Sequence, residues 1–245
     1  MHCPAERENK LGILDGVTSG IEHQPQRICV YGSHGVGKTT WACKFKNALV
    51  VATEDGSKNI DVSRVRVTRA IDALTAVHEA STSEFETIII DSADWLEKLI
   101  EVALHDENFK SDYGKGAVEV ARRFDKLLEQ LDRCVDNGKT VILIAHEEVR
   151  KVEDVTGATW DRLQPKLGKK VCGRLLEYCD EVFHAKFETF VTNKEEEFGR
   201  TRGVATTTNR RILATQPHPA YVAKSRVALP ATIDMNDPIT TSLQN

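Results

Sequence analysis

Four apolar runs recur along the first 145 residues, and segments with helical spacing separate them. The runs are 27–32, 48–52, 85–91 and 140–145. Short runs rich in Val, Ile, Leu and Ala, bounded by polar residues, are typical of buried strands. The last run, TVILIA, carries apolar residues on both faces, as a central strand of a parallel sheet should. The pattern therefore predicts a buried sheet.

The segments between the runs predict helices. Apolar residues recur at helical spacing, which predicts a helix that begins at Lys38, helices over 68–80 and 93–105, and a long helix that ends at Gly138. Strands that alternate with helices favour an α/β fold, in which crossover connections wind a mostly parallel sheet flanked by helices.

The pattern changes after the fourth run. Residues 146–170 are polar and carry both charge signs, which predicts a long loop of the kind that is usually functional in a compact domain. A helix over 171–179 follows, and two further strands are predicted at 181–191 and 211–216. These strands have the pattern of hairpins, so we expect antiparallel strands toward the C-terminus.

A glycine-rich stretch lies between the first apolar run and the first predicted helix. Residues 32–39 fit the pattern G-x-x-x-x-G-K-[ST] without a mismatch. Glycines let the backbone curl so that successive N–H groups point at phosphate oxygens. We expect Lys38 to reach the β- and γ-phosphates of a nucleotide and the Thr39 hydroxyl to bind Mg²⁺. The predicted phosphate-binding residues are Gly32, Ser33, His34, Gly35, Val36, Gly37, Lys38, Thr39 and Thr40.

Acidic residues at the ends of the other strands complete a candidate site. Asp91 ends the third run and fits the Walker B position, a metal ligand together with Thr39; a helix N-cap is the alternative. No glutamate follows Asp91, so the base that activates water must come from elsewhere. Glu54, after the second strand, is the candidate, and the adjacent Asp55 stays open. His146 closes the fourth run at the same sheet edge, where it could touch the γ-phosphate and report its loss to the following segment.

Composition narrows the partners and the compartment. The 245 residues carry a net charge of −4, so a nucleic-acid partner would need basic residues that are gathered locally. Six cysteines without a CxxC pair fit a reducing compartment, and no apolar run has the length of a membrane span. We therefore expect a cytoplasmic protein with no membrane partner, in which residues 1–25 form a polar N-terminal segment.

Basic residues cluster in two stretches of the chain. The first follows His146 and includes a tryptophan that could stack on a base, while its lysines would meet backbone phosphates. An ordinary solvated helix face is the alternative for this group. The predicted DNA contacts are Trp160, Arg162, Lys166, Lys169, Lys170 and Arg174. The second basic group consists of Arg200, Arg202, Arg210 and Arg211.

Three other classes of phosphate-loop protein are alternatives to an ATPase that acts on DNA. A GTPase needs N-K-x-D, but Glu196 fills the last position after Asn193 and Lys194, which disfavours guanine. A small-molecule kinase would need a lid, and residues 146–170 could serve as one. A nucleotide-gated DNA-binding or loading module with little hydrolysis is a further alternative.

An ordered series of motifs makes the chain resemble one family. The series is the phosphate loop, T-E-x-G, IIIDSADWLE, DYGKG, VILIAHEEV, PKLGKKVCGRLLEYCDEVFHA and TQPHPAYVAKSRVALP. It resembles the phage-encoded, RecA-like single-strand annealing ATPases, the Sak4-type recombinases within the phage AAA-type nucleotide-binding proteins. The resemblance implies a RecA-like ATPase core over residues 26–232, with a tail over 233–245.

The resemblance also implies an activity and a set of roles. The family uses ATP and Mg²⁺, binds single-stranded DNA in the host cytoplasm, and promotes annealing or strand exchange as a ring or filament with nucleotide at its subunit interfaces. A single-strand-binding protein is a further expected partner. Lys38 and Thr39 match phosphate and Mg²⁺ binding, Asp91 matches Walker B, Glu54 matches the catalytic glutamate, and His146 occupies the place of the sensor that couples the γ-phosphate to DNA-binding loops.

The stretch Lys224-Ser225-Arg226 resembles the K-x-R fingers of related RecA-fold ATPases, which enter the neighbouring subunit's nucleotide site. Relatives often continue R-F-G, whereas Val227 and Ala228 follow here. A cation at the γ-phosphate accelerates phosphoryl transfer by about 10³–10⁵-fold. No arginine near the phosphate loop is expected to serve in cis, so Lys224 and Arg226 are the candidate cations. A solvated strand edge is the alternative.

Overall fold

The computed structural model describes residues 14, 17–20, 24–110, 112–196, 200–239 and 243. Its strands are β1 (Arg27–Gly32), β2 (Ala48–Ala52), β3 (Ser63–Arg66), β4 (Thr87–Asp91), β5 (Thr140–Glu153), β6 (Thr159–Pro165), β7 (Glu181–Glu196), β8 (Arg200–Ala214) and β9 (Thr232–Asp234). Its helices are α1 (Lys38–Ala42), α2 (Ala70–Ser81), α3 (Ala93–Asp106), α4 (Lys115–Asp136) and α5 (Lys169–Tyr178), with a 3₁₀ turn at Asp112–Gly114.

The strands form one sheet in the order β3-β2-β4-β5-β1-β7-β8-β9, and β6 pairs with β5 beside this path. The strands β3, β2, β4, β5, β1 and β7 are parallel to their neighbours, while β8 and β9 are antiparallel. The phosphate-loop strand β1 is separated from β4, which ends in Asp91, by β5. The mostly parallel sheet flanked by helices, with antiparallel strands toward the C-terminus, confirms the predicted fold class.

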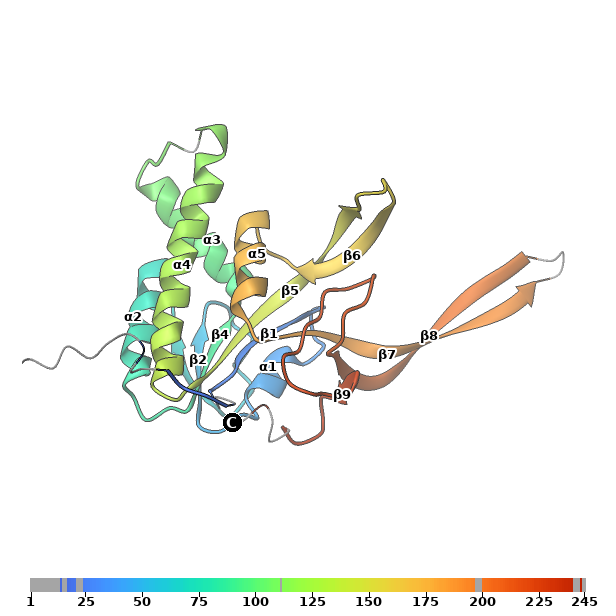
Figure 1. The fold of residues 1–245 in the computed structure, drawn as a ribbon, viewed down its shortest axis with the longest axis horizontal. Coiled ribbons are helices and arrows are strands. Elements are labelled where there is room, and N and C mark those ends of the chain that lie inside the picture. Colours follow the sequence, from blue (N-terminus) through green and yellow to red (C-terminus); the bar gives the residue numbers. More distant parts are fainter. Residues whose placement is uncertain are drawn as a thin grey trace, which may run out of the picture.

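Alternate residues of the central strands face two different layers. Cys29 and Tyr31 of β1 pack with α2, α3, α4 and α5, whereas Ile28 and Val30 pack with α1 and the C-terminal segment around β9. Figure 1 shows these helices on their faces of the sheet. Both faces are covered, which explains why the central strands are apolar throughout. The carboxyl ends of β1, β2 and β4 thus meet His146, in the middle of β5, at one edge of the sheet.

The prediction of a loop over 146–170 is wrong for residues 146–165. β5 continues to Glu153 and pairs antiparallel with β6, with Glu147 opposite Pro165 and Glu153 opposite Thr159. Asp154 closes the turn, because its carboxylate accepts hydrogen bonds from the backbone N–H groups of Thr156 and Ala158. The segment is therefore a β-hairpin that extends the central strand beyond the sheet edge, as Figure 1 shows.

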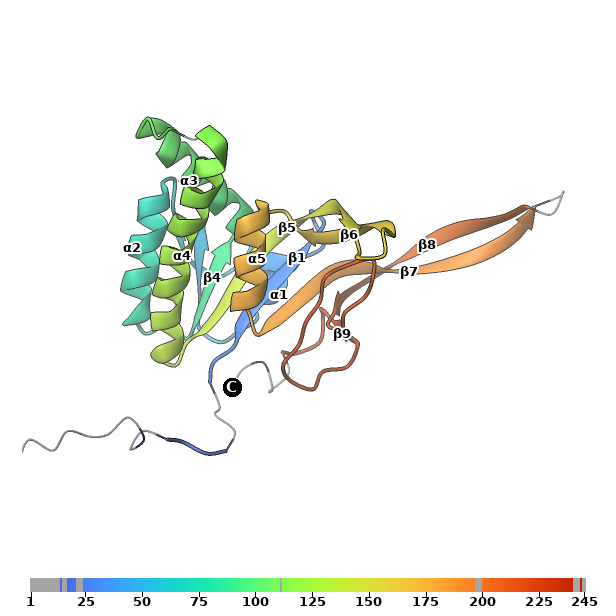
Figure 2. The same ribbon diagram turned by 45° about the horizontal axis from the view of Figure 1, so that its top comes forward.

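The antiparallel strands toward the C-terminus are confirmed, but they are longer than the apolar pattern predicts. β7 and β8 pair from His184 opposite Ala214 out to Glu196 opposite Arg200. Figures 1 and 2 show the far part of this hairpin projecting well away from the helices. The sequence of this projecting part is mostly polar, which explains why the apolar pattern predicted shorter strands, 181–191 and 211–216. β3 was not predicted, because its four exposed residues, SRVR, carry no apolar run.

Most of the predicted N-terminal segment 1–25 and part of the tail 233–245 lie outside the described residues. Within the part of the chain that the structure describes, none of the helices has the length and apolar character needed to cross a membrane.

Candidate nucleotide site

The phosphate loop joins β1 to α1 and is fixed at both ends. Gly35 and Gly37 adopt φ angles of 74° and 97°, a left-handed conformation that favours glycine. Gly32 passes so close to β7 that a Cβ there would lie 2.1 Å from the carbonyl oxygen of Ala185. Val36 is fully buried in the core and anchors the middle of the loop. These glycines and the buried valine therefore hold the phosphate loop in a curled conformation.

A cavity of about 320 Å³ lies beside this loop. It brings together residues from the loop, from the segment after β2, from the end of β4, from the middle of β5, and from β8. Of the predicted phosphate-binding residues, Gly32, Ser33 and Val36 shape the loop without lining the cavity. The lining residues are His34, Gly35, Gly37, Lys38, Thr39, Thr40, Glu54, Gly56, Asp91, His146 and Arg211.

The Lys38 ammonium is held inside this cavity by the loop itself. Its Nζ donates to the carbonyl oxygens of Gly32 at 2.8 Å and Ser33 at 2.9 Å. Burial lowers the pKa of Lys38, while the carboxylates of Asp91 and Glu54 oppose this shift. An ammonium group has three hydrogens, so one remains for a phosphate oxygen.

A hydroxyl and a carboxylate meet where a metal ion would bind. Thr39 Oγ1 donates to Asp91 Oδ2 at 3.0 Å, and burial raises the pKa of Asp91 to about 6. A Cβ on Gly56 would lie only 3.3 Å from the same Oδ2, so glycine leaves space there. Ser92, not Asp91, is the N-cap residue of α3, which removes the N-cap alternative for Asp91. The described residues hold no cluster of three or more acidic, His or Cys ligands.

This donor set fits Mg²⁺, which binds proteins through one or two oxygen ligands and takes the others from phosphates and water. Thr39 and Asp91 would hold it. A closed cage of protein ligands is not needed for this ion, unlike a structural zinc site.

His146 lies between two carboxylates. Its Nδ1 is 2.9 Å from Asp94 Oδ2, and its Nε2 is 3.9 Å from Glu54 Oε1. Asp94 also accepts the backbone N–H of His146 at 3.1 Å. Burial alone would raise the pKa of Asp94, but the hydrogen bonds from His146 outweigh it and hold that pKa below its usual range. The ring of His146 stacks on His34 at 4.0 Å, so the imidazole touches the phosphate loop.

The two candidate bases have different surroundings. Glu54 is half-buried and lines the cavity, whereas Asp55 is exposed. Asp55 forms ion pairs with Lys58, at 2.5 Å, and with Arg66. These partners hold the pKa of the Asp55 carboxyl below its ordinary value, which makes it a weaker base. The arrangement favours Glu54.

The predicted DNA contacts divide between the hairpin and α5. Trp160 and Arg162 lie on β6, opposite Val152 and Arg150. Trp160 Nε1 donates to the carbonyl oxygen of Pro219 at 3.0 Å, so one edge of the indole is fixed. Nε of Arg162 is buried without a hydrogen-bond partner among the described residues.

The remaining predicted contacts lie at the base of the hairpin and on α5. Lys166, Lys169 and Lys170 are exposed. Arg174 instead pairs with Asp125 and donates to the carbonyl oxygen of Ala121 at 2.9 Å, which ties α5 to α4. Its guanidinium therefore has a structural role.

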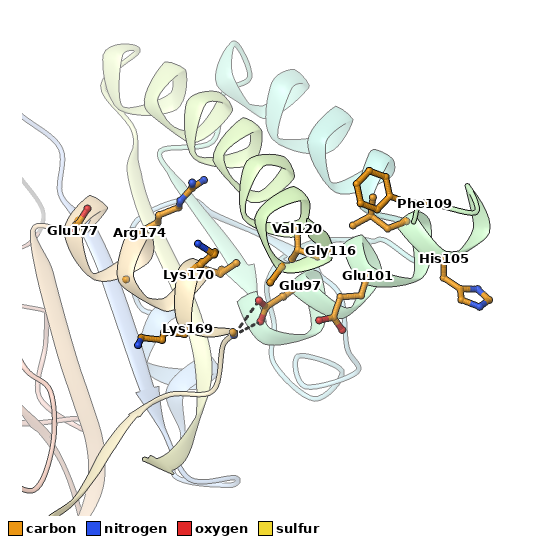
Figure 3. A pocket seen from close by; sticks show the side chains of 15 residues that line it. Glu97, Glu101, His105, Phe109, Gly116, Val120, Lys169, Lys170, Arg174 and Glu177 are labelled. Carbon is orange, nitrogen blue, oxygen red and sulfur yellow. Dashed lines mark hydrogen bonds between the residues drawn. The ribbon is translucent and has the colours of Figure 1, made fainter. Parts of the chain in front are cut away.

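Lys169, Lys170 and Arg174 line a cleft of about 850 Å³ between α3, α4 and α5. Figure 3 shows the acids Glu97, Glu101 and Glu177 around the same cleft. The cleft itself is thus of mixed charge rather than a continuous basic surface.

The helix α3 holds both ends of the hairpin. Near its start, Asp94 binds His146, where the chain leaves the sheet. One turn later, both carboxylate oxygens of Glu97 accept the N–H of Gly168, at 3.1 and 2.9 Å, where the chain enters α5. Burial raises the pKa of Glu97 to about 6. The backbone N–H of Lys166 also donates to the carbonyl oxygen of His146 at 2.8 Å, which closes the hairpin base.

Neither Lys224 nor Arg226, the candidate finger residues, lines the cavity beside the phosphate loop. Lys224 Nζ donates to the carbonyl oxygen of Leu176 at 2.7 Å, and the chain around Lys224 pairs with Val182. The Arg226 side chain is 62% exposed, and its Nη1 lies 2.9 Å from Asp180 Oδ1. Arg226 can reach outward, whereas Lys224 would first have to leave α5.

Arg211 is the charged cavity residue that the sequence analysis did not predict. It belongs to β8, which reaches the phosphate loop because β8 pairs with β7 and β7 pairs with β1. The expectation that no arginine lies near the phosphate loop in cis is therefore wrong. The signal available in the sequence was the second basic group, but only the strand register separates Arg211 from Arg210. The side chains of Arg200 and Arg202 lie outside the described part of the chain.

Comparisons with known proteins find distant structural similarity and one family match. Among solved structures, a KaiC-like protein from the hyperthermophilic archaeon Pyrococcus horikoshii OT3 is 13% identical, with a TM-score of 0.42 over 78% of this chain and 77% of its own. A prototypical ATPase from the type III secretion system of pathogenic bacteria is also 13% identical, with a TM-score of 0.42. That match covers 66% of this chain but 51% of the ATPase, so the chain spans about half its length.

A search of curated proteins gives no match. In contrast, residues 24–227 match a protein family described as the AAA domain, which covers most of the chain and includes every lining residue of the cavity. The chain belongs to the AAA domain family, as an AAA-type P-loop ATPase domain.

Proposed function

We propose that this ATPase domain is a DNA-binding recombination protein of the phage Sak4 type. It would assemble on single-stranded DNA in the cytoplasm of the bacterial host, hydrolyse ATP, and promote annealing or strand exchange. The observation that carries the proposal is the attachment of the β5–β6 hairpin to the nucleotide cavity through His146.

The connection from nucleotide to hairpin runs through few contacts. His146 lines the cavity, stacks on His34, and lies 3.9 Å from Glu54. From His146 the chain continues directly into the hairpin that carries Trp160. A change at the γ-phosphate that moved this imidazole would thus act on the base of the hairpin. Asp94 and Glu97 attach the two ends of the hairpin to one helix, α3.

The exposed chemistry of the hairpin region suits a single strand. Trp160 offers an aromatic face, and base stacking on such a ring contributes about 1–3 kcal/mol per base. Lys166, Lys169 and Lys170 are exposed and can bind backbone phosphates without reading sequence. This combination of stacking and positive charge supports single-stranded DNA as the partner.

The cavity supports ATP hydrolysis by a water molecule. Glu54 would accept a proton from the water as its oxygen bonds to the γ-phosphorus and the bond from that phosphorus to the β–γ bridging oxygen breaks. The products are ADP and phosphate. Lys38 would neutralise the phosphate oxygens beside Gly32 and Ser33. Mg²⁺ held by Thr39 and Asp91 would supply further positive charge there when bound.

Nucleotide control of DNA binding tests the proposal directly. We expect the affinity for a labelled oligonucleotide to differ between the empty, ADP-loaded and ATP-analogue-loaded protein, and the ATPase rate to rise with single-stranded DNA. The reason is the attachment of the hairpin to His146. Fluorescence anisotropy and phosphate release measure the two effects. Equal DNA affinity in all three nucleotide states would overturn the proposal.

A matched pair of triple variants locates the DNA contacts. Replacing Lys166, Lys169 and Lys170 by Ala should weaken DNA binding and reduce its logarithmic salt slope by about 2, since each phosphate contact contributes about 0.7. Replacing the exposed residues Lys46, Lys98 and Lys126 by Ala makes the same change in charge and should leave the slope unaltered.

Phosphate transfer to a small acceptor would favour a small-molecule kinase instead of a recombination protein. The segment that would have to serve as the lid of such a kinase, 146–170, is mostly a β-hairpin.

We further propose that Arg226, and Lys224 after release from Leu176, reach the nucleotide of a neighbouring subunit in a ring or filament. A head-to-tail interface of this kind lets two inactive variants complement each other. In an equal mixture of Lys38→Ala and Arg226→Ala subunits, about a quarter of the interfaces combine an intact loop with an intact finger.

ATPase activity should therefore return to part of the normal level in this mixture. As a control, either variant mixed with the double variant Lys38→Ala/Arg226→Ala should recover nothing. The Arg226 side chain is exposed and Asp180 keeps its contacts with Arg27, so the Arg226→Ala subunits should fold. A mixture that stays as inactive as its components would contradict the finger.

A further inference from the structure

Arg211 places a second cation at the phosphate loop of its own subunit. Arg211 lies opposite Phe187 in the β7–β8 ladder, and Ala185, two residues before Phe187, lies beside Gly32 in the β1–β7 ladder. The Arg211 side chain extends from β8 across β7 to the phosphate loop. A Cβ on Gly37 would lie 3.1 Å from Nη1 of Arg211 and 3.7 Å from its Cδ. The guanidinium thus rests directly on Gly37.

The charge of Arg211 is not balanced by an acid within the described residues. No hydrogen bond or ion pair of its side chain occurs there, and its guanidinium carbon lies 5.8 Å from the centre of the Phe187 ring. Its neighbour Arg210 differs: Nε of Arg210 donates to Asp234 at 2.6 Å, and Nη1 lies 3.5 Å from Glu188. Successive residues of a strand point to opposite faces, which separates the two arginines.

A half-buried guanidinium without an acid partner, in the same cavity as the Lys38 ammonium, is unfavourable unless an anion binds. The planar guanidinium is the side chain that best matches two oxygens of one phosphate. The contact with the Phe187 ring restricts the Arg211 side chain, so less freedom is lost when it binds. These features point to a built anion site rather than to a solvated surface charge.

The position of Arg211 selects which phosphate it binds. In the proposed function, Glu54 and His146 lie at the end of the cavity where water would attack the γ-phosphate. Arg211 instead contacts Gly37, between the loop and the Phe187 ring. We propose that Arg211 binds, in cis, phosphate oxygens that ATP and ADP share. The inference rests on the nucleotide cavity of the proposed function, and it is independent of DNA binding and of the Arg226 finger.

Titration calorimetry with Mg-ADP and with a non-hydrolysable Mg-ATP analogue tests this role. Arg211→Ala should raise both dissociation constants by a similar factor, about 10- to 100-fold, since a hydrogen-bonded ion pair is lost from both complexes. Arg211→Lys should recover part of the affinity, because one ammonium keeps the charge but not the paired geometry. Arg210→Ala, the matched control on the opposite face, should bind both nucleotides normally.

Three outcomes would count against the assignment. Unchanged affinity of Arg211→Ala for both nucleotides would remove Arg211 from the binding site. A loss for the ATP analogue alone would move Arg211 to the γ-phosphate and overturn its placement. Failure of the unmodified protein to bind either nucleotide would refute the nucleotide site itself and with it the proposed function. Arg211→Gln, which keeps length and polarity, replaces Arg211→Ala in the same measurements if thermal unfolding shows that the alanine variant does not fold.

Discussion

A Lys38→Ala variant will bind ATP and ADP at least about 30-fold more weakly than the unmodified chain, the loss expected when one partner of a buried charge pair is removed. Lys38 Nζ is held by Gly32 and Ser33 at the centre of the loop, where its remaining hydrogen can meet a phosphate oxygen. No other cavity residue can replace this donor, since Arg211 lies on the Gly37 side. Titration calorimetry with both nucleotides measures the loss.

The control for this prediction is Lys46→Ala. Lys46 is an exposed lysine whose ammonium pairs with Glu86 at 2.8 Å, away from the cavity, so nucleotide affinity should not change. Thermal unfolding of both variants separates a lost contact from a lost fold, because Lys38→Ala also removes two hydrogen bonds within the loop. A folded Lys38→Ala protein with normal ATP affinity would refute the nucleotide site.

The parts of the site that the sequence predicted are those that local chain geometry determines. The strand β1, the curled loop and the start of α1 at Lys38 follow one another within residues 27–42, so one motif specifies all three. Asp91 and His146 each come at the end of an apolar run, and such runs of a parallel sheet end at one edge. Distances between these residues then follow from the strand order.

The parts that were missed depend on contacts between distant segments. Arg211 reaches the loop only through two strand registers, β1 with β7 and β7 with β8, and a shift of one residue would have brought Arg210 there instead. The β5–β6 hairpin was read as a loop because its strands extend past the sheet and are largely polar. The choice between Glu54 and Asp55 likewise needed the partners of Asp55, Lys58 and Arg66.

The division into 1–25, 26–232 and 233–245 stays a prediction. β9, at Thr232–Asp234, pairs with β8 across its expected boundary, with Ile233 opposite Leu213. Met235 then donates its N–H to the carbonyl oxygen of Arg211 at 2.9 Å, so the chain beyond 232 supports the strand that carries this arginine. A truncation at residue 232 would therefore be a poor way to isolate the ATPase core.

A Glu54→Gln variant will bind ATP normally and hydrolyse it about 10²–10⁴-fold more slowly, the usual contribution of a general base. The amide keeps the size of the carboxylate beside His146 but cannot accept a proton from water at neutral pH. Phosphate release and calorimetry separate the two effects, since a base acts on kcat rather than on affinity. Asp55→Asn is the matched control: Asp55 is exposed and paired with Lys58, so its loss should leave kcat almost unchanged. If Asp55→Asn stops hydrolysis while Glu54→Gln does not, the neighbouring carboxylate is the base and the loop after β2 must rearrange to bring it into the cavity.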